Sequence, residues 1–262
     1  MYGRGDGAIY QQGKFVEYMK RVLVVGGANG IGLSIATELA NRETVERVYV
    51  VDKAMLADEF RHPKFEFHQF DLTLADYSIF HQFDDIDTLM ITAGFGSLQL
   101  FRDVNEQMII DSFNVNTIPT LRIIKHFYPK LESPKPFYCG VMVSIAGFMS
   151  SPFFSVYAAT KAALKVFIES VNVELTKAGT DNRILNVSPG SLKGTSFSAC
   201  KTDLTVTAPM AQAIIQHLEN RDDLFIPQYE EVFRNVLERY HADFRAEGIH
   251  SYEYKVNSGR IK

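Results

Sequence analysis

The chain alternates short apolar runs with longer segments in which apolar residues recur at helical spacing. The runs are too short for helices and rich in β-branched residues, which is typical of strands buried on both faces. These predicted strands cover residues 22–25, 48–51, 65–70, 88–91, 141–144 and 184–187. The predicted helices cover residues 31–40, 74–83, 105–131 with an interruption at Pro119, and 156–175. Strands that alternate with helices indicate an α/β fold, a doubly wound parallel sheet of the Rossmann type.

The same pattern gives the domain organisation. No repeat or low-complexity linker divides the chain, so we expect one domain over residues 19–262. Residues 1–18 contain four glycines and no periodic pattern, and we interpret them as a leader or disordered arm. The polar, unpatterned stretch that follows the last long helix and strand predicts a substrate lid over 191–222. Residues 227–262 predict a C-terminal helical extension, with a helix over about 229–247 and a polar tail.

Composition excludes several functional classes. Hydrophobic residues make up 46% and charged residues 22% of the 262, which is ordinary for a globular protein. The net charge of −4 gives no electrostatic argument for a nucleic acid or membrane partner. No apolar run approaches the roughly 20 residues that span a bilayer, and no signal peptide is indicated. The two cysteines, Cys139 and Cys200, and the seven histidines show no metal-ligand spacing, so we expect no metal and a cytoplasmic location.

The turn after the first strand carries three glycines, Gly26, Gly30 and Gly32. Glycine permits a tight turn and a close approach of the backbone to a pyrophosphate. The helix that follows directs its N–H groups and positive dipole end at the phosphates. The spacing Gly-x-x-x-Gly-x-Gly differs from the standard fingerprint, and a tight turn without a ligand is the alternative interpretation.

Asp52 strengthens the interpretation as a dinucleotide site. It ends the second apolar run, twenty residues after Gly32, where an acidic side chain can accept hydrogen bonds from a ribose diol. Its carboxylate would repel a 2′-phosphate, which favours NAD(H) over NADP(H). Lys53 is the one neighbouring charge that opposes this preference. Small or polar residues at six strand ends predict one continuous cofactor groove, formed by Gly26–Gly32, Asp52, Asp71, Gly94, Ser144 and Pro189-Gly190.

Tyr157 and Lys161 lie four residues apart on a predicted helix, so their side chains share one face. A tyrosine with a pKa near 10 transfers protons poorly at neutral pH, and we expect the nearby ammonium to lower that pKa. This pair follows a strand-ending serine, Ser144, by thirteen residues. Two further pairs share the spacing but lie in the leader and across a strand end, Tyr10/Lys14 and Tyr49/Lys53.

Together these residues resemble the short-chain dehydrogenase/reductase family in its single-domain form, over roughly Lys20 to Ser196. The resemblance rests on Gly26-x-x-x-Gly30-x-Gly32, Asp52, Asp71-Leu72, Ala93-Gly94, Asn116, Ser144, Tyr157-x-x-x-Lys161 and Pro189-Gly190. It implies cofactor contacts from Gly26, Asn29, Gly30, Ile31, Gly32, Asp52, Asp71, Leu72, Ala93, Gly94, Tyr157, Lys161, Pro189, Gly190 and Thr195.

The resemblance also implies a catalytic tetrad. Tyr157 would be the general acid/base, and Ser144 would hold the substrate oxygen. Lys161 would lower the tyrosine pKa and bind the nicotinamide ribose, and Asn116 would anchor a water that relays protons. Each role has an alternative. Ser144 could only end its strand, and Tyr157 and Lys161 could be a solvated pair on a helix. Asn116 could be a polar residue that interrupts the helix before Pro119, and Asn114 lies two residues upstream.

The sequence departs from the family pattern at several positions. Val25 replaces the usual threonine of the glycine turn, and Thr92 stands where an asparagine is usual, so looser cofactor contacts are expected there. Thr195 comes one residue later than the family threonine. Asn29 supports NAD(H), because many NADP-preferring relatives have a basic residue in this turn. The stretch 224–227 replaces a glycine-rich strand, which puts the usual tetramer contacts in doubt.

These observations predict an oxidoreductase that transfers a hydride between NAD(H) and a ketone or secondary alcohol. We expect a small, apolar substrate, no nucleic-acid or membrane partner, and a homo-oligomer, dimer or tetramer. The expected apolar pocket draws on two or three of Phe95, Phe148, Phe153, Phe154 and Phe197. A dinucleotide-binding redox sensor or scaffold subunit is the alternative. Epimerase or dehydratase chemistry on a nucleotide-sugar would need a larger substrate domain than the residues after Pro189 supply.

Overall fold

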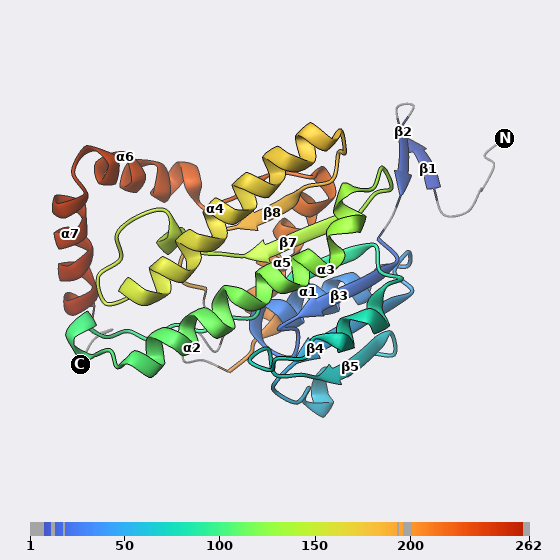
Figure 1. Cartoon of the computed structure of the whole chain (residues 1–262), viewed down its shortest axis with the longest axis horizontal. Helices are drawn as coiled ribbons and strands as arrows, with labels where there is room; N and C mark the ends of the chain where they lie inside the picture. Colours follow the sequence, from blue (N-terminus) through green and yellow to red (C-terminus); the bar gives the residue numbers. More distant parts are fainter. Residues whose placement is uncertain (1–7, 12–13, 18, 193, 196–200, 259–262) are drawn as a thin grey trace.

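The computed structural model describes residues 8–11, 14–17, 19–192, 194–195 and 201–258. Seven strands form one sheet in the order β5-β4-β3-β6-β7-β8-β9, and every neighbouring pair is parallel. These strands are β3 Arg21–Val25, β4 Arg47–Asp52, β5 Phe65–Gln69, β6 Thr88–Ile91, β7 Tyr138–Met142, β8 Ile184–Val187 and β9 Leu224–Phe225. The predicted doubly wound parallel sheet is confirmed, and its order reverses between β3 and β6 (Figure 1).

Helices cover both faces of the sheet (Figure 1). One face packs against α1 Gly30–Ala40 and α5 Leu204–Asn220. The other packs against η2 Ser78–Phe83, α3 Ile118–Glu132 and α4 Ser155–Ala178. The remaining helical elements are η1 Asp58–Phe60, η3 Phe101–Asp103, α2 Glu106–Asn116, η4 Ile145–Gly147, the π-helical turn η6 Tyr229–Phe233, α6 Arg234–Ala242 and α7 Phe244–Asn257. No helix in the described ranges combines the length and apolar character needed to cross a membrane.

The central strand β3 explains why the sequence shows continuous apolar runs. Val22 and Val24 belong to the core under α1 and α5, whereas Leu23 and Val25 belong to the core under α3 and α4. All four side chains are at most 1% exposed. Successive side chains of a strand point to opposite faces, so a strand covered on both faces must be apolar at every position.

Two predicted elements in the first part of the chain differ in extent. The crossover helix expected over 74–83 is only the short 3₁₀ helix η2, because a polar turn stabilised by Asp76 occupies the preceding residues. The expected leader contains an antiparallel hairpin, β1 Ala8–Gln11 and β2 Lys14–Glu17. The interruption expected near Pro119 is confirmed, since α2 and α3 meet at Thr117.

The second half differs more. The lid expected over 191–222 is in large part helix: α5 begins at Leu204, and its Ala211, Ile214 and Leu218 are buried against the sheet. The helix expected over 229–247 divides at Asp243, whose carboxylate caps α7 through the backbone N–H groups of the next turn. The residues expected to form a polar tail therefore continue as helix as far as Asn257.

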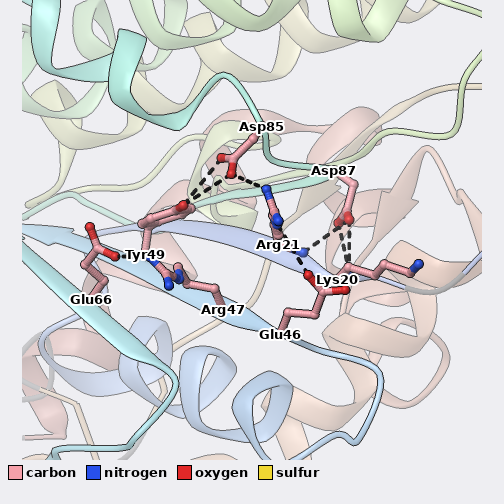
Figure 2. A network of polar contacts seen from close by, with 8 residues as sticks. All are labelled: Lys20, Arg21, Glu46, Arg47, Tyr49, Glu66, Asp85 and Asp87. Carbon is pink, nitrogen blue, oxygen red and sulfur yellow. Dashed lines mark hydrogen bonds and ion pairs between the residues drawn. The ribbon is translucent and has the colours of Figure 1, made fainter. Parts of the chain in front are cut away.

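Charged side chains join the amino ends of the strands (Figure 2). Arg21 pairs with Asp85 at 2.5 Å, and Arg47 pairs with Glu66 at 2.6 Å. Asp87 accepts hydrogen bonds from the backbone N–H groups of Lys20 and Arg21. Exposed ion pairs of this kind contribute little to stability. They fix the entry of the chain into the sheet, at the opposite strand ends from the cleft described below.

Candidate active site

A cleft of about 1010 Å³ opens at the carboxyl ends of the parallel strands. It spans the point where the strand order reverses, which is where α/β sheets of this type bind ligands. The predicted residues that line it are Gly26, Asn29, Gly30, Ile31, Gly32, Asp52, Asp71, Leu72, Ala93, Gly94, Ser144, Tyr157, Lys161, Pro189, Gly190 and Thr195. Asn116 is fully buried behind this wall.

The glycine turn is held by Thr92. Its hydroxyl donates to the carbonyls of Val25 and Gly26, at 3.1 and 2.9 Å. Thr92, which departs from the family pattern, therefore links the end of β6 to the glycine turn. A Cβ on Gly32 would lie 2.2 Å from the Gly26 carbonyl oxygen, closer than any side chain permits. Gly26 itself has a φ of 85°, which favours glycine. Without side chains at these positions, the backbone of the turn can approach a dinucleotide closely.

Two backbone N–H groups of this turn already have side-chain partners. Ala28 donates to Asp52 Oδ2, and Gly30 donates to Thr202 Oγ1, both at 2.9 Å. The first bond fixes the acidic side chain at the edge of the turn. The second brings the segment before α5 onto the amino end of α1, where a phosphate would bind.

Asp52 and Lys53 have different surroundings. Asp52 Oδ1 also accepts from the backbone N–H of Ala54 at 2.9 Å, so the carboxylate is held by one backbone donor at each oxygen. Lys53 forms an ion pair of 2.7 Å with Asp71, and this bond is the main cause that lowers the pKa of Asp71 to about 2. The charge of Lys53 is therefore directed at a second carboxylate instead of the space beside Asp52.

Tyr157 and Ser144 lie together in the wall of the cleft. The hydroxyl of Ser144 is hydrogen-bonded to that of Tyr157 and accepts from the backbone N–H of Ala146 at 3.1 Å. Burial raises the pKa of Tyr157 to about 12, and the Ser144 bond opposes this rise. The low pKa expected for Tyr157 is wrong for the protein groups alone, because desolvation of the phenolate is the largest effect.

Lys161 lies one helical turn further along α4. It is 3% exposed, and its Nζ donates to the carbonyl of Met142 at 2.9 Å. Burial lowers its pKa from 10.5 to about 8, because the ammonium loses its hydration. The Nζ lies 5.7 Å from the centroid of the Tyr157 ring. A lysine of this pKa exchanges protons close to neutral pH.

Asn116 acts on the site from behind. Its side-chain amide donates to the Phe95 carbonyl at 2.8 Å and to Thr160 Oγ1 at 3.2 Å, and it accepts from the Phe95 N–H at 2.9 Å. Thr160 is the neighbour of Lys161, and its hydroxyl donates to the Tyr157 carbonyl. The buried amide therefore joins the loop after β6 to the helix that carries the reactive pair.

A family model described as short chain dehydrogenase matches residues 20–204. The chain belongs to the short-chain dehydrogenase family. It is 27% identical to retinol dehydrogenase 8 of Bos taurus over 232 residues, which cover 83% of this chain and 73% of that protein. Membership of this family makes the chain an oxidoreductase and supports a nicotinamide dinucleotide as its cofactor.

Solved structures show the same fold. A short-chain dehydrogenase of Streptomyces avermitilis has a TM-score of 0.67 at 22% identity, covering 88% of this chain and 98% of that one. An alcohol dehydrogenase of Thermococcus sibiricus complexed with 5-hydroxy-NADP has a TM-score of 0.66 at 19% identity, covering 80% and 96%.

Fewer phenylalanines line the cleft than the two or three expected. Phe154 lines it, whereas Phe153 is buried, has a φ of 69° and is not a lining residue. Phe95 and Phe148 are not among the lining residues, and Phe197 lies outside the described residues. The lining residues that sequence reasoning missed include Leu98, Val115, Ser151 and Lys255. No motif marks them, because tertiary packing alone brings them together.

Three side chains away from the cleft form an arrangement that the chain order hides. His81, Asp84 and His126 have nitrogen and oxygen atoms within 4.8 Å of one another, and His126 Nε2 lies 3.2 Å from Asp84 Oδ1. Sequence spacing gave no sign of this cluster, since His126 comes from α3 and the others from the end of η2. Cys139 is buried, which raises its pKa to about 12, and Cys200 lies outside the described residues.

Proposed function

We propose that this dehydrogenase interconverts a secondary alcohol and a ketone with NAD(H), using Tyr157 as the general acid/base. The observation that carries the proposal is the hydrogen-bonded pair Tyr157–Ser144 beside the buried Lys161, at the end of a cleft that begins at the glycine turn. A hydroxyl pair of this kind can bind a carbonyl oxygen and exchange a proton with it. The name of the bovine relative, a retinol dehydrogenase, is consistent with alcohol chemistry.

The residues present fit a dinucleotide. The turn of Gly26 and Gly32 would take the pyrophosphate, Asp52 the adenosine ribose, and Lys161 the nicotinamide ribose. When bound, the nicotinamide supplies or accepts the hydride. Every other step in the proposal belongs to side chains of this chain.

In the reducing direction, the Tyr157 hydroxyl donates its proton to the carbonyl oxygen while Ser144 holds that oxygen by a second hydrogen bond. Oxidation reverses these transfers. A pKa of about 12 keeps the hydroxyl protonated at neutral pH but makes it a weak acid, because the phenolate is costly to form. Protonated Lys161 lowers that cost, because a cation close to the ring favours the phenolate. With a pKa of about 8, Lys161 itself can be recharged from solvent at neutral pH.

Asn116 has a positioning role in this proposal. Its amide holds the Phe95 loop and Thr160 together, and through Thr160 the turn of α4 that carries Tyr157 and Lys161. Its part in a proton relay through water stays a prediction.

The preference for NAD(H) rests on Asp52. Its carboxylate faces the cleft, fixed by Ala28 and Ala54, where a 2′-phosphate would bring a second negative charge. Lys53 does not relieve that repulsion in this arrangement, since it pairs with Asp71. NADPH should therefore bind more weakly than NADH.

The test is a calorimetric titration with NADH and NADPH, followed by turnover of a panel of ketones and secondary alcohols. Tight NADH binding with oxidation or reduction of any of these compounds is the expected result. Binding without turnover over the whole panel would favour the alternative, a redox-sensing subunit. Binding of neither cofactor would overturn the assignment of the glycine turn and the mechanism with it.

A further inference from the structure

Helix α7 packs one of its faces on the loop that precedes the catalytic helix. Phe244, Gly248, Tyr252 and Lys255 recur at spacings of four, four and three residues, so they share one face. Their partners follow one another along the chain from residue 150 to 154. Figure 1 shows α6 and α7 together at one end of the molecule, beyond the long helix α4.

The contacts along this face are close. Ser150 Oγ donates to the Phe244 carbonyl. A Cβ on Gly248 would lie 3.2 Å from Ser150 Oγ. The Tyr252 ring lies over that of Phe153, with centroids 4.6 Å apart. These contacts fix the position of α7 relative to the loop, and therefore the position of its last turn.

That last turn places a lysine in the cleft wall. Lys255 is 8% exposed, and its Nζ donates to the Pro152 carbonyl at 2.8 Å and to Ser151 Oγ at 3.2 Å. Both Lys255 and Ser151 line the same cleft as Tyr157. The Phe154 ring is close to both Lys255 and Tyr157: its centroid is 5.6 Å from Lys255 Nζ and 5.4 Å from the Tyr157 ring centroid.

The charges that line the cleft are distributed unevenly. The described acidic lining residues, Asp52 and Asp71, belong to the cofactor end, and Lys53 is paired there. At the substrate end the described charged lining residue beyond Lys161 is Lys255. Attraction between opposite charges is stronger in a partly buried site than in water, because the surroundings screen it less.

From this placement we propose that Lys255 and Ser151 bind a carboxylate of the substrate, so that the enzyme acts on an oxo acid or hydroxy acid. The inference rests on the proposed function and names its substrate class. A carboxylate can accept from the ammonium and from the serine hydroxyl together, which are already held 3.2 Å apart. Leu98 and Phe154 add apolar surface to the cleft wall, which suits a substrate with a hydrocarbon body.

The experiment compares oxo acids of increasing chain length with their methyl esters, which lack the negative charge and carry one added methyl group. With the wild-type enzyme and NADH, at least one acid should show a KM well below that of its ester. Lys255→Met keeps the length of the side chain and removes the charge. It should raise the KM of that acid by about 10–100-fold, the usual effect of losing a hydrogen bond to a charged group. The KM of the ester should rise much less, because the ester has no charge to pair with, and Lys255→Arg should recover part of the loss for the acid.

Lys165→Met is the matched control, since Lys165 lies on α4, pairs with Glu169 and does not line the cleft. An equal loss for acid and ester in Lys255→Met would show that Lys255 only supports the loop at Pro152, and the inference would fall. Esters turned over as well as acids by the wild type would also overturn it, while the proposed function stands. If no carbonyl compound is turned over, calorimetry of the acids and esters with the NADH complex still decides whether Lys255 binds a carboxylate.

Discussion

The two halves of the cleft are built in different ways. The cofactor half depends on backbone: the turn of Gly26 and Gly32, and the carboxylate of Asp52 held by N–H groups. The substrate half depends on side chains from distant segments, such as Ser151 and Lys255, which are 104 residues apart. A turn of defined backbone geometry requires particular residue types at a fixed spacing along the chain, whereas packing between distant segments leaves no such spacing. The first half can therefore be predicted from the sequence, whereas the second can be identified only in the folded structure.

The largest effect is expected where the two halves meet, at Tyr157. Tyr157→Phe removes the proton donor and keeps the ring that packs beside Phe154. We expect kcat to fall by about 10²–10⁴-fold, the usual contribution of general acid–base catalysis. NADH should bind as before in a fluorescence titration. Tyr128→Phe, on α3 and outside the cleft, is the control and should keep its turnover. Parent turnover in Tyr157→Phe would remove the tyrosine from the mechanism.

Lys161 should show that the catalytic centre costs stability. Its pKa falls from 10.5 to about 8 on folding, so the folded state binds fewer protons than the unfolded state between these values. The penalty is absent above pH 10.5, grows as the pH falls, and is complete below about pH 8. At about 1.4 kcal/mol per pKa unit it is on the order of 3 kcal/mol. The Met142 carbonyl, which would lose its donor, offsets about 1 kcal/mol of this.

Lys161→Met should therefore raise the free energy of unfolding at pH 7 by about 2 kcal/mol while turnover is lost. Urea denaturation at pH 7 and at pH 10 measures the change, and the gain should shrink at the higher pH. Lys165→Met, with its half-exposed partner Glu169, should change stability by less than about 0.5 kcal/mol. A variant less stable than the parent at pH 7 would show that the ammonium is stabilised in the fold instead.

Asp52 tests whether the cofactor half also reads the cofactor. Asp52→Ala removes the carboxylate that would repel a 2′-phosphate, and it should reduce the ratio of NADPH to NADH dissociation constants by about tenfold or more. The ratio is the informative quantity, because loosening of the turn at Ala28 affects both cofactors alike. An unchanged ratio in calorimetry would mean that another residue selects the cofactor.

The sheet and the shared helix face of Tyr157 and Lys161 could be predicted because both follow periodic rules. Continuous apolar runs mark strands covered on both faces, as β3 shows, and Tyr157 and Lys161 share a helix face by their spacing. The pKa of Tyr157 could not be predicted in the same way. Its direction depends on how far the ring is buried, and burial outweighs the hydrogen bond from Ser144. Thr92 is a similar case, since its bond to the glycine turn joins residues 66 positions apart.

The segment after β8 was the least predictable part of the chain. Its polar residues indicate a loop, yet Ala211, Ile214 and Leu218 carry a helical pattern that buries α5 beside α1. The amino end of that helix brings Thr202 to Gly30, 172 residues away. No local pattern encodes such a contact, because it depends on how two helices pack on one face of the sheet.

This contact gives the smallest expected effect. The Thr202 hydroxyl accepts from the Gly30 N–H at 2.9 Å, on the turn where the pyrophosphate would bind, so hydroxyl and cofactor compete for one donor. Thr202→Val removes the hydroxyl and keeps the shape of the side chain. A hydrogen bond of this kind contributes about 0.5–1.5 kcal/mol, so NADH should bind about 2–10-fold more tightly in a calorimetric titration.

Thr205→Val is the control for this change, because the Thr205 hydroxyl donates to Asp203 and leaves Gly30 alone. Its NADH affinity should equal that of the parent. If Thr202→Val instead weakens NADH binding, the hydroxyl contributes to the cofactor site and does not compete with it. The cofactor half would then also depend on a side chain from a distant segment, and the contrast between the two halves of the cleft would be lost.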